Sequence, residues 1–319
     1  MMLEPDDLLR IIDYAHEFSQ KSSVATNPKI YLADSIGYYN LKEISIKEKV
    51  LGEEDAIWPG CGAGKSGFGI LHNGDIVPCT SLRNENYIQG NIRDTRLIDI
   101  WNGGFKQFRE FSASQLKGFC SDCMYSSICL GGCANTRYCV EGCIESENKY
   151  CLYGVMVKKE LNKLLRADND YKLADIKRQI SDCIKSDNYQ LLIAYIYEIL
   201  PRYLSGTEIW IYLMNTLAFS YFKIELFEKT LEVCQQVLKN DSTNLDALKG
   251  YGLSLYHTGE TTTGKQILFD CINNSKNSCS DIYSDLVNIM RIEGNESEAA
   301  RLIAEASKKY PDFLIKRGY

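Results

Sequence analysis

Seven of the thirteen cysteines in this 319-residue chain stand at spacings that suit metal binding. They are Cys61, Cys79, Cys120, Cys123, Cys129, Cys133 and Cys151. A thiolate is a soft ligand, and two cysteines separated by two residues can present both sulfurs to one metal site. In a reducing compartment, clustered cysteines are metal ligands more often than disulfide partners. The chemistry expected of this stretch is therefore metal binding.

The seven thiols divide by position into two neighbouring groups. The compact group has four members: Cys120, Cys123, Cys129 and, as a fourth ligand, Cys151. The other group has three members: Cys61, Cys79 and Cys133. Gly74 lets the chain between Cys61 and Cys79 fold back, so that these two thiols can meet. Since Cys133 is four residues from Cys129, the two sites should lie side by side.

Structural zinc is the alternative explanation of these thiols. Such zinc sites are closed by four protein ligands, and seven cysteines do not divide into fours. Cys139 and Cys143 lie nearby, and we expect both to be unligated. The other four cysteines are far apart on helical segments, where a free cysteine acts as a small buried hydrophobe. They are Cys183, Cys234, Cys271 and Cys279.

The cysteine series resembles the seven-cysteine motif of SPASM domains, which form the C-terminal part of many radical S-adenosylmethionine (SAM) enzymes that mature peptides and proteins. The motif here is Cys61-x12-Gly-x4-Cys79, then Cys120-x2-Cys-x5-Cys-x3-Cys133, then Cys151. The surrounding segments GCGAGKSGFGILHNGDIVPC, QGNIRDTRLIDIW and GFCSDCMYSSICLGGC agree with it. The resemblance covers residues 30 to 153.

This resemblance implies two auxiliary [4Fe-4S] clusters. The first would be held by Cys61, Cys79 and Cys133. The second would be held by Cys120, Cys123, Cys129 and Cys151. The first site then has one cysteine fewer than it has irons. Its open position could be filled by a substrate atom, by water, or by Cys139 or Cys143.

The same resemblance shows what the chain lacks. The radical SAM reaction requires a CxxxCxxC loop at the start of a partial barrel, and the sequence contains none. Cys139 and Cys143 begin such a pattern, but Ser146 stands at the third position. We therefore do not expect this chain to generate a radical on its own. The predicted parts are 1–58, a remnant helix, strand and linker resembling the end of that barrel; 59–155, the SPASM-like domain; and 156–319, helical repeats.

Few regular elements are expected around the cysteines. They are a helix over residues 4–20, a short strand over 29–33, an extended connection over 34–60, hairpin strands over 68–71 and 75–78, and a helix within 91–107. Asn73-Gly74 gives the hairpin its turn. From Cys120 onward we expect loops and short helices around the ligands.

The chain after residue 152 has an amphipathic helical pattern with a repeat of 34 and 35 residues. Matching places in its three copies are held by Ala218, Gly252 and Val287. Gly259 and Gly294 mark the turns between paired helices, and Pro311 falls where the last repeat would close. The pattern resembles tetratricopeptide repeats, and a generic helical bundle is the alternative. The expected fold class is α+β, a small cysteine-rich domain followed by an all-α repeat domain.

Composition excludes several classes of function. A net charge of -6 and a pI near 5.3 give no reason to expect binding to nucleic acid or to an anionic membrane. The longest apolar run is about half of a bilayer span, and no secretory signal opens the chain, so we expect a cytoplasmic protein. The segment GAGKSG imitates a phosphate loop, but Pro59 stands where that motif needs glycine.

These features together predict an iron–sulfur protein that assists a separate radical SAM enzyme in peptide modification. Its role would be electron transfer or substrate docking, with a peptide or protein partner bound by the helical repeats. Two alternatives remain open. One is a non-catalytic binding module with structural clusters, and the other is a truncated fragment of a radical SAM peptide maturase.

Overall fold

The computed structural model describes residues 3–21, 30–32, 40–52, 58, 60–167, 172–274 and 280–310. The chain divides into two compact units, Met1–Ala167 and Asp168–Tyr319. We call them the cysteine-rich unit and the helical unit. Among the helices in these ranges, none combines the length and apolar character that a bilayer span requires.

Three helices form one end of the cysteine-rich unit: α1 (Asp7–Lys21), α2 (Leu41–Leu51) and α7 (Leu152–Ala167). Their apolar faces share a small core of six buried residues: Leu8, Ile12, Ala15, Ile46, Leu152 and Val155. The helix predicted over residues 4–20 is confirmed by α1. The core joins residues from both ends of the unit, so the N-terminal segment packs on the chain that follows the last predicted ligand.

Two predictions for the N-terminal segment are wrong. The extended connection expected over 34–60 is a helix at 41–51, which the Asn40 side chain caps by accepting the Lys42 and Glu43 amides. Gly52 ends that helix at φ 72°, in the left-handed region. The strand expected over 29–33 is not formed by the described residues 30–32, and its two end residues lie outside the described ranges.

A three-stranded antiparallel sheet holds the predicted hairpin. Its strands are β1 (Gly69–Ile70), β2 (Asp75–Val77) and β3 (Gly90–Asn91), in that spatial order. Ile70 pairs with Ile76, and Ile76 in turn pairs with Gly90 on β3. Gly74 takes φ 89° in the turn, as the hairpin prediction requires. The third strand was not predicted.

Short helices follow the sheet, and α3 and α4 divide the region predicted as one helix. The helices and 3-10 turns of this region are η1 (Glu85–Tyr87), α3 (Leu97–Gly103), α4 (Lys106–Arg109), η2 (Ala113–Gln115), η3 (Gly118–Asp122), α5 (Ser126–Cys129) and α6 (Ala134–Glu141). The break between α3 and α4 lies at Phe105, which takes φ 64° and cannot continue a right-handed helix.

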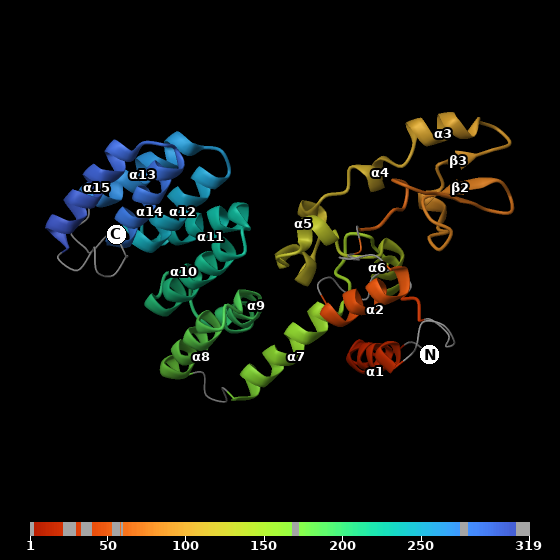
Figure 1. Ribbon diagram of the computed structural model, residues 1–319, viewed down its shortest axis with the longest axis horizontal. Coiled ribbons are helices and arrows are strands. Elements are labelled where there is room, and N and C mark those ends of the chain that lie inside the picture. The colour runs from red at the N-terminus through yellow and green to blue at the C-terminus, as the bar shows by residue number, and fades with distance from the viewer. Residues whose placement is uncertain are drawn as a thin grey trace. The chain divides into compact units, whose positions relative to one another are not determined.

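The helical unit is a stack of antiparallel helices (Figure 1). It begins with α8 (Leu173–Lys185), α9 (Tyr189–Ile199) and η4 (Leu200–Arg202). Three helix pairs follow: α10 (Glu208–Lys223) with α11 (Phe227–Asn240), α12 (Leu245–His257) with α13 (Thr261–Asn274), and α14 (Ser280–Ile292) with α15 (Glu296–Lys309). These pairs confirm the predicted all-α repeat region.

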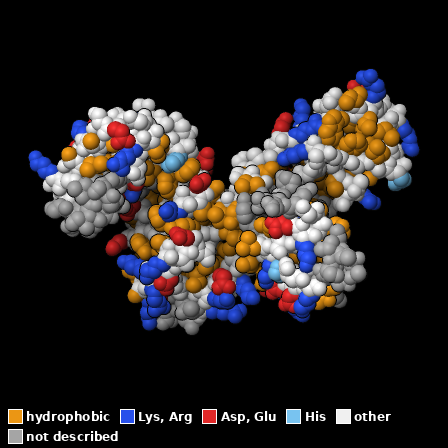
Figure 2. All heavy atoms as spheres, in the orientation of Figure 1, with side chains coloured by type: hydrophobic (Ala, Val, Ile, Leu, Met, Phe, Trp, Pro, Cys, Tyr) orange, Lys and Arg blue, Asp and Glu red, His pale blue; other side chains and the backbone are white. Residues whose placement is uncertain are grey.

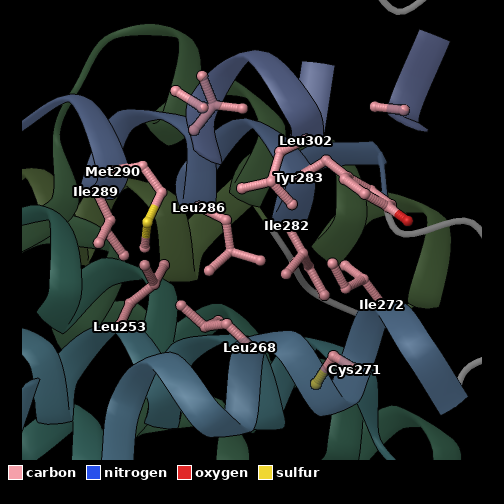
Figure 3. Close-up of a cluster of buried hydrophobic side chains, with 13 residues drawn as sticks. Leu253, Leu268, Cys271, Ile272, Ile282, Tyr283, Leu286, Ile289, Met290 and Leu302 are labelled. Atoms are coloured by element: carbon pink, nitrogen blue, oxygen red, sulfur yellow. The ribbon is translucent and has the colours of Figure 1, made fainter. Parts of the chain in front are cut away.

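The matching places of the repeat are buried in the first helix of each pair. Ala218 is 4% exposed and Val287 is fully buried. Gly259 and Gly294 take positive φ at the turns between helices, and Glu225 takes φ 62° at the same place in the first pair. Figure 3 shows the core of the last two pairs, in which thirteen buried residues from α12 to α15 pack together. Pro311 lies outside the described residues.

Helices α12 and α13 approach each other closely at Gly264, so we expect substitution of this glycine to be destabilising. A Cβ added at Gly264 on α13 would lie 2.5 Å from the Gly252 carbonyl oxygen on α12, and both contacts it meets first are backbone atoms. We expect Gly264→Ala to lower the free energy of unfolding by about 1 to 2 kcal/mol, because overpacking outweighs the better helix propensity of alanine. Urea denaturation measures this. Thr262→Ala, at an exposed position of the same helix, should be neutral; equal effects would contradict the close-packing argument.

Candidate cluster-binding site

The four cysteines of the compact group line one pocket in the cysteine-rich unit. The pocket has about 410 Å³ of empty space, including its mouth. Its wall contains Cys120, Cys123, Cys129 and Cys151. Cys120 and Cys123 are buried, and the other two are half-buried. The structure therefore brings together all four thiols that were predicted as the second set, from positions 31 residues apart at the extremes.

The local backbone explains how the thiols come to face one another. Cys123 follows η3, Cys129 ends α5, and Cys151 lies directly before α7. After α5 the chain reverses through Leu130, Gly131 and Gly132, at φ 48°, 75° and 74°. Three successive left-handed residues form a tight turn, and two of them are glycines because that region disfavours a side chain. The turn carries the chain from one group of cysteines to the other.

Backbone amides point at the sulfurs of this pocket. The amide of Asn148 donates to Cys120 Sγ at 3.4 Å, and the amide of Tyr125 donates to Cys123 Sγ at 3.4 Å. Hydrogen bonds from amides to ligand sulfurs stabilise thiolates and tune the potentials of iron–sulfur sites. In the other group, the Ser81 amide donates to Cys79 Sγ at 3.5 Å. The backbone is thus arranged to carry negative charge on sulfur.

Burial is the largest cause of the raised pKa values of three thiols in this pocket. It raises the pKa of Cys120 to about 11 and the pKa of Cys129 to about 12, and it also raises the pKa of Cys123. Negative charge on Cys151 raises the pKa of all three thiols further. Without a metal, the pocket holds these three thiols in their protonated form at neutral pH.

This acidity predicts a pH dependence for metal uptake. A thiol must lose its proton to bind metal, and protonated thiols release one proton each on binding. We expect the dissociation constant for Co²⁺, used as a spectroscopic probe of the metal-free chain, to fall by about tenfold or more per pH unit between about pH 6.5 and about pH 8.5. Titration of the thiolate–cobalt absorption measures it. A constant that is flat over this range would show that these thiols are already ionised.

The four thiols of this pocket form a complete donor set for an iron–sulfur cluster, in which each thiolate binds a different iron. The residues present therefore fit a four-cysteine cluster.

Two members of the three-cysteine group pack against one hydrophobic core. Cys61 and Cys79 both pack against the core of Ala63, Leu82, Tyr87, Phe108, Ala134 and Ile144. The Gly64 amide donates to the Pro78 carbonyl at 3.1 Å, which ties the chain after Cys61 to the end of β2. Cys133 is buried and precedes α6, next to Ala134 of that core. The assignment of these three to one cluster stays a prediction.

The two spare cysteines, Cys139 and Cys143, form hydrogen bonds with side chains close to them in the sequence. Cys143 Sγ donates to Glu145 Oε2, and this hydrogen bond lowers the pKa of the Glu145 carboxyl. Cys139 is exposed and donates to Asn135 Oδ1 at 3.5 Å. Of the helical cysteines, Cys183, Cys234 and Cys271 are buried as predicted, and Cys279 lies outside the described residues. No described cysteine forms a disulfide.

The helical unit has a groove of its own. About 1200 Å³ of empty space lies along α10, α12 and α14, lined by aromatic and charged side chains. In its lining, the ammonium of Lys249 forms salt bridges with Asp281 at 2.6 Å and with Asp285 at 3.1 Å. Tyr212 and Phe219 contribute apolar surface.

Comparison with known proteins agrees with the cysteine pattern. Residues 61–124 match the SPASM family, described as an iron-sulfur cluster-binding domain. The match includes Cys61, Cys79, Cys120 and Cys123, and ends before the other three predicted ligands. The chain therefore carries a SPASM iron–sulfur domain followed by a helical region.

The chain is also similar to curated AdoMet-dependent heme synthases. It is 35% identical over 101 residues to the one from Oleidesulfovibrio alaskensis, covering 31% of this chain and 24% of that protein. For the one from Methanosarcina barkeri the identity is 30% over 157 residues, covering 47% and 43%. For the one from Nitratidesulfovibrio vulgaris it is 34% over 101 residues, covering 31% and 26%. The matched part of the chain thus spans 24% to 43% of the length of these relatives.

Proposed function

We propose that this chain holds two [4Fe-4S] clusters and assists a separate radical SAM enzyme in peptide modification, by electron transfer or by docking the substrate. The pocket lined by the four cysteines of the second set carries the proposal. When bound, iron–sulfur clusters supply one-electron transfer. The chain's own residues contribute the thiolate ligands, the amide hydrogen bonds to sulfur and a largely buried pocket.

Two observations support a macromolecular partner. Exposed hydrophobic side chains gather over α3 and the sheet (Figure 2), among them Phe68, Ile70, Leu97 and Ile98. Apolar patches of this kind are typical of interaction surfaces. The groove of the helical unit offers a second surface, one that suits a peptide. The relatives are named for dependence on AdoMet, which supports a partner that uses it.

Anaerobic purification followed by iron and sulfide analysis tests the proposal. We expect about eight irons and about eight sulfides per chain, and an EPR signal that appears on reduction and vanishes on reoxidation. A colourless protein with bound zinc would overturn the cluster assignment. Clusters that cannot be reduced by dithionite would overturn the electron-transfer role and favour the alternative, a binding module in which they are structural.

A further inference from the structure

Arg137 is a buried arginine close to both groups of cysteines. It is only 2% exposed. It lies on α6 one turn after Cys133, whose carbonyl accepts the Arg137 amide at 3.3 Å. Within the described ranges its guanidinium forms no salt bridge with a carboxylate. Glu145 is near enough to sense its charge, but that carboxylate accepts the hydrogen bond of Cys143.

The contacts of the guanidinium fix it beside the link between the two groups. Its Nη1 donates to the carbonyl of Leu130, the residue after Cys129. The Phe111 ring lies 5.2 Å from its central carbon. Its Nε is buried without a hydrogen-bond partner among the described atoms. A Cβ on Gly131 would lie 1.8 Å from Nη1, so this glycine leaves the space that the guanidinium fills.

A buried charge that lacks a counter-ion is costly, so the fold must provide negative charge nearby. Besides the Glu145 carboxylate, the groups whose negative charge favours the charged arginine are four cysteines: Cys120, Cys61, Cys129 and Cys133. Two of these belong to each predicted cluster site. Thiolates bound to iron would keep their negative charge at neutral pH.

We propose that Arg137 is a shared counter-ion of the two cluster sites, a positioning residue whose fixed positive charge raises the reduction potential of both. The proposal rests on the proposed function, since it requires clusters in both sites. Reduction adds one electron and no bond is made or broken at Arg137. Because the added charge is negative, a nearby guanidinium in a low-dielectric setting favours the reduced state.

The test is a redox titration of the anaerobically purified full chain, monitored by EPR, with iron content measured on each sample. The variants are Arg137→Gln, which removes the charge, and Arg137→Lys, which keeps it. Arg96→Gln is the control, because Arg96 is exposed and bonded to Asp99. We expect Arg137→Gln to disfavour reduction at least tenfold, which is about 59 mV for one electron. Arg137→Lys should lie nearer to the wild type, and Arg96→Gln should match it.

The outcomes separate this inference from the proposed function. A wild-type chain without iron would overturn both. With wild-type iron present, unchanged potentials in Arg137→Gln would overturn the inference alone. Loss of iron in Arg137→Gln but not in Arg137→Lys would support it, because lysine keeps the positive charge that glutamine lacks. Loss of iron in both variants would overturn it in favour of a packing role.

Discussion

Removal of iron from the purified chain is expected to unfold the cysteine-rich unit and leave the helical unit folded. The reason lies in the size of the cores. Among the described residues, the hydrophobic cores that lie wholly within the cysteine-rich unit contain six, six and three buried side chains. The strands of this unit are only two or three residues long. A metal site that is absent from the unfolded chain contributes its binding energy to folding, on the order of 10 kcal/mol for structural sites.

The helical unit has no such dependence. The last two helix pairs alone share a core of thirteen buried residues, and each repeat is stabilised by its neighbours. After chelation under reducing conditions, thermal unfolding followed by circular dichroism should therefore keep one cooperative transition, from the helical unit. Limited proteolysis with mass spectrometry should cut between residues 60 and 150 and spare residues 172–274. Equal protection of both units after iron removal would contradict this prediction.

The sequence predicted those parts of the site that depend on local spacing. Gly74 marked the hairpin turn, because it takes φ 89°, which glycine adopts readily. The four cysteines of the compact group meet in one pocket, since three of them lie within ten residues and the fourth precedes a helix. The repeat period likewise placed the three helix pairs, because each copy buries its matching position in the same way.

The missed features depend on contacts between distant residues. Strand β3 has only two residues, and its pairing with β2 is what defines it. Helix α2 has a single buried hydrophobic residue, Ile46, so its charged sequence shows no clear apolar periodicity. The capping residues Asn40 and Gly52, at its two ends, were the available sequence signals. Arg137 was not singled out from the sequence, and its burial depends on the space that Gly131 leaves for its guanidinium.

Serine substitutions of single cysteines should show how the iron is divided between the two sites. Cys123 lines the four-cysteine pocket and is buried there, so Cys123→Ser replaces a soft ligand by a hard, poor one in a site that has no spare thiol. We expect it to remove the second cluster and lower the iron content by about half, from about eight to about four per chain. Cys79→Ser should remove the first cluster and lower the iron content by the same amount. The double variant should hold almost no iron.

Cys139→Ser is the matched control, because Cys139 is exposed and bonded only to Asn135 within its own helix. It should retain wild-type iron. EPR distinguishes the two single variants, since each should lose a different signal while the other persists. The two sites are joined by the short turn from Cys129 to Cys133, so loss of both signals from Cys123→Ser would mean that the turn transmits the damage. Loss of neither signal from Cys79→Ser would remove Cys79 from the ligand set.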